Sequence, residues 1–141
     1  MLISRLVFTP LSFRYWATRL VPYGYRKNTS ADIEGNRIFI AEDRDKVIGY
    51  LFGHVEKAEK ASSIMPDGTP FFEVEELYVK PMHRSKGIGG RLIEYVEKAV
   101  SAEAEYILLS TATKNWIAIF HFYLDEIGME FWSARLFKKI K

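Results

Sequence analysis

Three carboxylates lie close together in an otherwise apolar run of the chain. Glu73, Glu75 and Glu76 fall within segment 71–79, whose other residues are aromatic or aliphatic. Partial burial raises the pKa of a carboxylate, so such a group can accept a proton near neutral pH. Strand alternation predicts that Glu73 and Glu75 share one face and that Glu76 faces the other way. These glutamates are candidates for a general base; the alternative is that they form ion pairs at an exposed end of a sheet.

A cluster of glycines and basic residues follows this run, with the sequence Arg84-Ser85-Lys86-Gly87-Ile88-Gly89-Gly90. The glycines let the backbone approach a ligand closely and let successive amides point the same way. At the start of a helix, such amides and the helix dipole bind an anion such as a pyrophosphate. The alternative is an ordinary strand-to-helix turn with a basic rim. The spacing matches neither a Walker A motif nor a full dinucleotide fingerprint, which argues against NTP and NAD.

The elements that position these residues follow from the hydrophobic pattern. Segments 37–42 and 47–55 are rich in β-formers and predict an antiparallel hairpin. Segment 71–79 predicts a third strand, the 3.6-residue period of 87–103 a helix, and 106–110 another strand. This strand, helix and strand predict a βαβ unit, and therefore an α/β domain with a mixed sheet.

Other segments also carry regular patterns. We expect, in chain order, a short strand at 3–9, an amphipathic helix at 10–20, a loop or short helix at 23–35, a loop at 56–69, a helix at 115–127 closed by Gly128, and a last strand at 130–139.

Composition narrows the functional classes. The 141 residues include no cysteine, which excludes disulfides, thiolate zinc sites and a cysteine nucleophile. A net charge of +2 gives no field that would favour nucleic acid. No stretch is long and apolar enough to predict a membrane span. We expect a single cytoplasmic domain over residues 1–141 that binds no metal, nucleic acid or membrane.

The segment from Glu76 to Gly89 resembles the central motif of the GNAT superfamily of N-acetyltransferases, a strand followed by Arg/Gln-x-x-Gly-x-Gly/Ala and a helix. Arg84, Gly87 and Gly89 match this motif, and the order of elements over about 37–131 agrees. The resemblance implies an α/β (α+β) GNAT-like fold, with a mixed, mostly antiparallel central sheet flanked by helices and a splayed strand pair that holds CoA. It also implies transfer of an acetyl group from acetyl-CoA to a primary amine.

In such an enzyme the pyrophosphate of acetyl-CoA would lie on the amides of 85–90, and its pantetheine arm would pair with the backbone of the preceding strand. The cofactor-binding residues implied by the resemblance are Leu77, Tyr78, Val79, Arg84, Ser85, Lys86, Gly87, Ile88, Gly89, Gly90, Asn115 and Tyr123.

The resemblance also ranks the candidate bases. Counting back from Arg84, Glu73 aligns with the general base of some family members, so Glu73 is the first choice and Glu75 the second. His54 and His83 are alternative bases, although an isolated histidine is more often a surface or packing residue.

The resemblance departs from the family pattern in the helix that follows the fifth strand, where the family has Asn-x-x-Ala-x-x-Phe-Tyr-x-x-x-Gly. Asn115, Ala118 and Gly128 match in kind, but the spacing from Asn115 to Tyr123 is one residue longer. The counted position falls on Phe122, and Tyr123 is turned by about 100° around a regular helix. A bulge would restore Tyr123. The resemblance implies that Tyr123 is the general acid beside the CoA sulfur; the alternative is an aromatic helix face packed in the core.

The acceptor is the least defined part of the function. Carboxylates near the site suit a cationic amine such as a polyamine, a lysine side chain or a protein N-terminus. A non-catalytic acyl-CoA-binding sensor is the alternative function, and the shifted tyrosine motif supports it. We expect a monomer or a homodimer.

Overall fold

The computed structural model describes residues 2–6, 18–21, 24–27, 29–59, 64–111, 115–136 and 138–140. The chain divides into two compact units, Met1–Ser110 and Thr111–Lys141. The prediction that residues 1–141 form one domain stays a prediction. No helix in the described ranges has the length and apolar character that crossing a bilayer requires.

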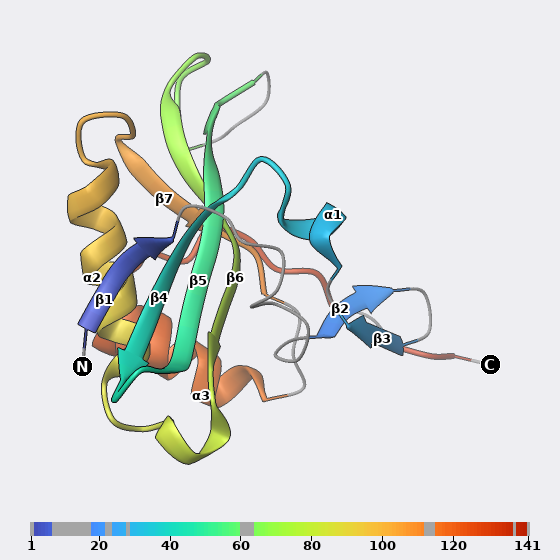
Figure 1. Cartoon of the computed structure of the whole chain (residues 1–141). Helices are drawn as coiled ribbons and strands as arrows, with labels where there is room; N and C mark the ends of the chain where they lie inside the picture. Colours follow the sequence, from blue (N-terminus) through green and yellow to red (C-terminus); the bar gives the residue numbers. More distant parts are fainter. Residues whose placement is uncertain are drawn as a thin grey trace. The chain divides into compact units, whose positions relative to one another are not determined.

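A five-stranded sheet in the order β1-β4-β5-β6-β7 forms the centre of the first unit (Figure 1). Its strands are β1 (Leu2–Leu6), β4 (Arg37–Asp43), β5 (Lys46–Lys57), β6 (Pro70–Val79) and β7 (Tyr106–Leu109). The first four pair antiparallel with their neighbours, whereas β6 and β7 are parallel. The mixed, mostly antiparallel sheet is therefore confirmed.

The predicted β4–β5 hairpin closes through a tight turn. Arg44 and Asp45 both have positive φ, 49° and 61°. A two-residue turn of this kind has a backbone twist that matches the twist of the strands it joins. The hairpin runs from Arg37 to Lys57, so the predicted strands at 37–42 and 47–55 are confirmed.

Helix α2 (Ile88–Val100) covers one face of the sheet and packs against β4, β5 and β6. The ring of Tyr95 in α2 meets Phe39 of β4 edge to face, with ring centroids 6.1 Å apart. The buried residues of α2 are those of the predicted apolar stripe, namely Ile88, Leu92, Ile93, Val96 and Val100. The βαβ unit β6-α2-β7 thus forms as the sequence predicts.

The short helix α1 (Ser30–Ile33) contributes to the core on the other face of the sheet. Its Ile33 is buried with Ile38, Ile40, Tyr50 and Phe52 in one cluster. Ile38 and Ile40 alternate with Phe39, which faces α2, so the cluster lies on the side opposite α2. The candidate base Glu73 belongs to this side, because it pairs with His54 of β5, two residues from Phe52.

The N-terminal predictions are only partly correct. A hairpin of β2 (Thr18–Val21) and β3 (Gly24–Lys27) lies where a helix at 10–20 was expected to end. The helix is wrong over 18–20, because β-favouring residues there find a partner strand just beyond Pro22; residues 10–17 lie outside the described residues. The short helix expected within 23–35 is confirmed as α1, and the strand β3 was missed. The strand expected at 3–9 is present over Leu2–Leu6, and residues 7–9 are not described.

The described residues of the second unit, 115–136 and 138–140 with Thr111, contain one helical segment. It begins as α3 (Trp116–Phe120) and continues as a π-helix, η2 (His121–Glu126). Gly128 closes it with φ 77°, as predicted. The strand predicted at 130–139 is wrong, since residues 130–136 and 138–140 have no regular structure. Phe131 and Trp132 are adjacent rather than alternating and both are exposed, so the segment lacks an apolar face to bury in a sheet.

Candidate active site

The glycine loop forms the predicted connection between β6 and α2. A 3-10 turn, η1 (Pro81–His83), leads into it, and helix α2 follows Gly87, which has φ 74°. The first α2 bond runs from the amide of Arg91 to the carbonyl of Gly87, at 3.1 Å. The amides of residues 88–90 precede that bond, and no side chain caps the helix. The loop therefore presents backbone donors at a helix N-terminus, as anion binding requires.

Arg84 is held at the start of this loop by two contacts. Its Nε donates to the carbonyl oxygen of Val79 at 2.8 Å, and its guanidinium lies 5.8 Å from the ring centroid of Tyr78. Lys86 and Arg91 are exposed on the same loop and helix start. The loop thus combines uncapped amides with three basic side chains, which fits a pyrophosphate group.

The pairing of β6 with β7 ends halfway along β6, where β7 ends. They pair only from Phe71↔Tyr106 to Val74↔Leu109. Beyond this point β6 continues to Val79, and within the described ranges no strand pairs with residues 75–79 on the side of β7. The described residues thus leave this edge of β6 unpaired, as the splayed strand pair expected from the resemblance would require. Its open backbone edge leads to the glycine loop and suits an extended ligand arm that pairs with peptide groups.

A β-bulge changes which faces the glutamates occupy. Glu76 pairs with Phe52 and Glu73 pairs with His54, and the register shifts between these pairs so that Glu75 is the extra residue of β6. Phe52 and His54 are two residues apart on β5 and share a face, so Glu73 and Glu76 share that face as well. The prediction that Glu76 points away from Glu73 is wrong, because it assumed uninterrupted alternation.

Glu76 and two tyrosines form a packed polar group on this face. The hydroxyl of Tyr50 donates to Glu76 Oε1 at 2.6 Å. The rings of Tyr50 and Tyr78 stack with centroids 5.4 Å apart, and Tyr78 is the ring beneath Arg84. Contacts therefore run continuously from Glu76 to the start of the glycine loop. Sequence reasoning missed Tyr50, although its spacing of two from Phe52 and four from His54 was the available signal.

Glu73 has the protonation behaviour expected of a general base. Burial first, and then the neighbouring carboxylates Glu75 and Glu56, raise its pKa against the opposing effect of His54, and the net pKa is about 7. A carboxylate with such a pKa is largely ionised just above neutral pH and still basic enough to accept a proton. Glu75, the second candidate, is the exposed bulge residue. Of the two, Glu73 has the environment that general-base catalysis requires.

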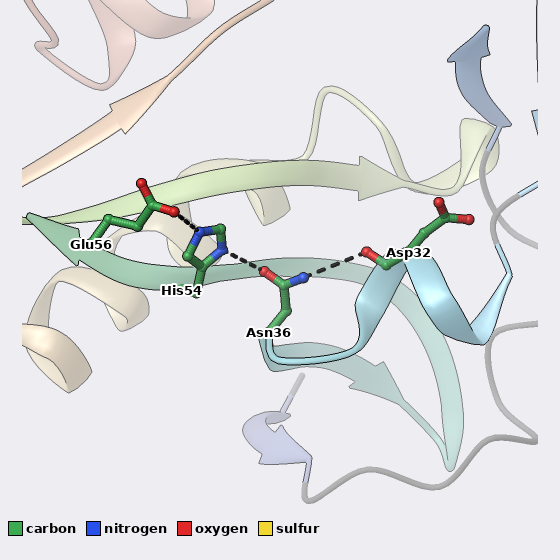
Figure 2. Close-up of polar contacts among 4 residues, drawn as sticks. All are labelled: Asp32, Asn36, His54 and Glu56. Carbon is green, nitrogen blue, oxygen red and sulfur yellow. Dashed lines mark hydrogen bonds and ion pairs between the residues drawn. The ribbon is translucent and has the colours of Figure 1, made fainter.

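The neighbours of Glu73 on β5 belong to a chain of polar contacts (Figure 2). His54 contacts Asn36 Oδ1 through Nδ1 at 2.9 Å and Glu56 Oε1 through Nε2 at 2.8 Å. Asn36 in turn donates from Nδ2 to the carbonyl oxygen of Asp32 at 3.5 Å. The other histidine considered as a base, His83, lies in η1 after β6. The sequence predictions named His54 but missed Asn36 and Glu56.

Tyr123 lies in the second unit, within the π-helix. The amide of Ile127 bonds the carbonyl of Phe122 five residues earlier, at 3.0 Å, which is the π-helical pattern. A π turn takes up one more residue than an α turn, but the wide turn here spans Phe122 to Ile127, so most of it follows Tyr123 and it does not account for the long Asn115–Tyr123 spacing. Burial raises the pKa of Tyr123, which keeps its hydroxyl protonated and able to donate. Asn115 is the exposed residue that precedes α3.

Comparisons with known proteins agree with this geometry. Residues 34–125 match the family model described as acetyltransferase (GNAT) domain. The aminoglycoside N-acetyltransferase AAC(6')-Iy in complex with CoA is similar in structure, with TM-score 0.59 and 19% identity over 77% of this chain and 78% of that one. Glucosamine-6-phosphate N-acetyltransferase from Arabidopsis thaliana is similar with TM-score 0.55 and 16% identity, over 76% of this chain and 68% of that one. Ribosomal-protein-alanine N-acetyltransferase from Brucella melitensis biovar Abortus 2308 is similar with TM-score 0.56 and 16% identity, over 74% of this chain and 72% of that one.

Proposed function

Because the chain belongs to the GNAT acetyltransferase family, we propose that it transfers the acetyl group of acetyl-CoA to a primary amine by direct attack in a ternary complex. The chain is an N-acetyltransferase, and the observation that carries the proposal is the uncapped glycine loop at the open edge of β6. Bound acetyl-CoA supplies an acetyl group activated as a thioester. The protein must hold that group, orient the amine and move protons.

The glycine loop and the unpaired part of β6 would hold acetyl-CoA. The amides of 85–90, with Arg84 and Lys86, would bind the pyrophosphate, and the backbone of Leu77, Tyr78 and Val79 would pair with the pantetheine arm. Gly87 supports this role, because its left-handed backbone gives the turn that exposes the amides and it carries no side chain that would occupy the anion position. On the basis of the family resemblance alone, we also propose that Asn115 and Tyr123 contact acetyl-CoA.

Glu73 would accept the proton that the attacking amine must lose, directly or through a water molecule. Its pKa of about 7 supports this role, and Glu75 is the second candidate. Tyr123 would donate a proton to the departing thiolate, which its protonated hydroxyl permits. We prefer Tyr123 to Phe122 for this role, since Tyr123 carries a hydroxyl and a phenyl ring has no proton to donate.

The acceptor we propose is a cationic amine, such as a polyamine, a lysine side chain or a protein N-terminus. Glu56 and Glu76 lie on the face of the sheet that carries Glu73, and exposed Glu75 adjoins it. Their carboxylates would attract an ammonium group before it loses its proton. The titles of the similar structures name aminoglycoside, glucosamine-6-phosphate and ribosomal-protein alanine acetyltransferases, all of which act on amines.

A non-catalytic acyl-CoA sensor remains the second candidate function. The spacing from Asn115 to Tyr123 and from Tyr123 to Gly128 departs from the family pattern by one residue each, and this departure is its support. The two functions separate in one assay, since only an acetyltransferase releases free CoA thiol when acetyl-CoA and an amine are both present.

Thiol release from acetyl-CoA therefore tests the proposed function directly. The panel should contain spermidine, a lysine peptide, a peptide with a free N-terminus, an aminoglycoside and a neutral amine. Turnover of the cationic amines supports the proposal. Tight binding of acetyl-CoA, with no release of CoA thiol in the presence of any of these amines, would identify a sensor. Turnover of neutral amines alone would refute the proposed acceptor class.

A charge introduced in the glycine loop tests the pyrophosphate site separately. Gly87→Asp would place a carboxylate at the anion position and should weaken acetyl-CoA binding roughly tenfold or more by calorimetry. Gly68→Asp is the matched control, because Gly68 also has a left-handed backbone, φ 83°, with no neighbour within 4 Å of an added Cβ. Equal affinities of the two variants would argue against the assigned loop.

A further inference from the structure

His54 lies in the middle of the contact chain that crosses the face of the sheet opposite α2. Asn36 and Glu56 bind its two ring nitrogens from opposite sides, and the three side chains lie in line in Figure 2. The bond from Asn36 Nδ2 to the carbonyl of Asp32 turns the amide oxygen of Asn36 toward the imidazole. Both contacts of the ring are therefore with oxygen acceptors.

This arrangement suits a doubly protonated imidazole. An amide oxygen and a carboxylate can only accept, and a neutral ring has a single N–H to donate. An imidazolium can donate to Asn36 and to Glu56 at once, so the charged form is the one that satisfies both contacts. With both nitrogens engaged as donors, His54 has no free lone pair with which to take a proton from the acceptor amine.

Glu73 is the cross-strand partner of His54 in the β5–β6 pairing. Residues directly opposite on one face of an antiparallel pair have their Cβ atoms about 5 Å apart, close enough for their charges to interact. The other titratable groups of the described elements on this face are Tyr50 and Glu56 of β5, Glu76 and Tyr78 of β6 with the bulge residue Glu75, Tyr106 of β7, Glu42 of β4 and Asp32 of α1. Asp32 directs its carboxylate to Thr29, and Arg37 of β4 pairs with Glu103 on the other face.

The pKa of Glu73 is therefore set by opposing effects, with burial and neighbouring carboxylates on one side and the imidazole of His54 on the other. Burial, Glu75 and Glu56 raise the pKa of Glu73, and His54 lowers it. Without a charge on His54, the remaining influences all favour the protonated acid. A protonated Glu73 cannot accept a proton from an amine.

We propose that His54, held between Asn36 and Glu56, is a positioning residue that keeps Glu73 ionised and so ready to accept the proton of the acceptor amine. This inference rests on the proposed function, in which Glu73 is the base. The proton passes from the amine nitrogen to a Glu73 carboxylate oxygen and then to solvent, and His54 takes no part in that transfer.

The carboxyl carbon of Glu73 allows a test that needs no acceptor. Protein labelled with carboxyl-¹³C glutamate is titrated by NMR from pH 4 to pH 9, and the Glu73 signal is identified by its loss in Glu73→Gln. The wild-type midpoint is expected near pH 7. His54→Gln keeps a polar side chain but removes the charge, and should raise the midpoint by about one unit or more.

His54→Lys is the matched variant, since it restores a positive charge without the imidazole. It should return the midpoint of Glu73 to within a few tenths of the wild-type value, which a purely structural role for His54 would not predict. The side chain of His54 is 28% exposed, so both variants are expected to fold. An unchanged midpoint in His54→Gln, or a His54→Lys midpoint that matches that of His54→Gln, would overturn the inference.

Acetyl transfer then separates this inference from the proposed function. The pH at which the rate levels off should rise in His54→Gln by the same amount as the NMR midpoint and return in His54→Lys. If the wild-type protein acetylates no amine, the proposed function fails, even where the NMR midpoints move as expected. If Glu73→Gln transfers acetyl groups at the wild-type rate, Glu73 is not the base and the inference fails, although acetyl transfer stands. If Glu73→Gln is inactive but the NMR midpoint of Glu73 is the same in wild type and in His54→Gln, only the inference fails.

Discussion

Gly53 should be intolerant of even one added methyl group, because β5 and β6 approach closely at the bulge. A Cβ at position 53 would lie 2.0 Å from the carbonyl oxygen of Glu73 and 2.8 and 2.9 Å from two ring carbons of Phe72. Real Cβ atoms essentially never come within 3.0 Å of another heavy atom. Gly53→Ala therefore requires the two strands to move apart by about 1 Å at this point.

The surroundings leave little room for that movement. The obstructing oxygen belongs to the backbone, and Phe72 is fully buried beneath α2 and Phe39. Overpacking of this kind typically costs about 1–3 kcal/mol, and each strand hydrogen bond that breaks costs about 1 kcal/mol more. We expect Gly53→Ala to lower the free energy of unfolding by about 2–4 kcal/mol.

Urea unfolding followed by circular dichroism measures this loss. Gly49→Ala is the matched control, since Gly49 lies on the same strand and its added Cβ would meet the carbonyl oxygen of Tyr78 at 2.9 Å. That backbone oxygen must also move, but by a few tenths of an ångström instead of about 1 Å, so Gly49→Ala should cost clearly less than Gly53→Ala. The reasoning is refuted if Gly53→Ala unfolds within about 0.5 kcal/mol of wild type, or if both variants lose equal stability.

The same variant tests whether the bulge positions Glu73. Under conditions where Gly53→Ala is still folded, acetyl transfer should fall by up to about 100-fold, because a displacement of about 1 Å is enough to misalign a catalytic group. A folded Gly53→Ala with the wild-type rate would show that the placement of Glu73 does not depend on this contact.

Three further predictions concern single side chains. The wild-type rate should fall about tenfold per pH unit below pH 7, because protonated Glu73 cannot act as a base. With the same acceptor, Glu73→Gln should be slower by about 100-fold or more, and its pH–rate profile should lose the bend near pH 7. A bend retained in Glu73→Gln would contradict the assignment. Tyr123→Phe should slow thiol release at least about tenfold without weaker acetyl-CoA binding, whereas an unchanged rate would leave Tyr123 a packing residue. Tyr50→Phe removes the 2.6 Å bond to Glu76 from a buried position and should cost about 1–3 kcal/mol in urea unfolding; no measurable loss would contradict that contact.

The elements that the sequence predicts best are those with a long local period. The apolar stripe of α2 repeats over several turns, and the β4–β5 hairpin combines two β-rich runs with a short polar turn. The glycine loop was predictable for the same reason, since its position between a strand and a helix is a local property. The short strands β2 and β3 lack such a period, because four residues are too few to distinguish a strand from a helix end.

The candidate site depends on contacts that a local pattern does not contain. Alternation placed Glu73 and Glu76 on opposite faces, and one bulge residue, Glu75, reverses that result. An isolated glycine inside a strand is a recognised signal of a bulge, and Gly53 provides it on the facing strand. The signal does not say which residue of the partner becomes the extra one, since that depends on the register of β5 against β6.

The electrostatics of Glu73 argue that β6 is adapted to chemistry at some cost in stability. Its pKa of about 7 in the folded protein lies above the ordinary value of 4.5. A carboxyl whose pKa is raised by folding contributes stability below its unfolded pKa, and that contribution is lost as the pH rises through the folded value. Between pH 4.5 and 7 the fold therefore becomes progressively less stable on account of Glu73. An apolar residue would avoid this loss in a half-buried strand position, and an exposed carboxylate would not be basic near pH 7. A carboxylate in this position is explained by the need for a group that is ionised and still basic at the pH where the amine must lose its proton.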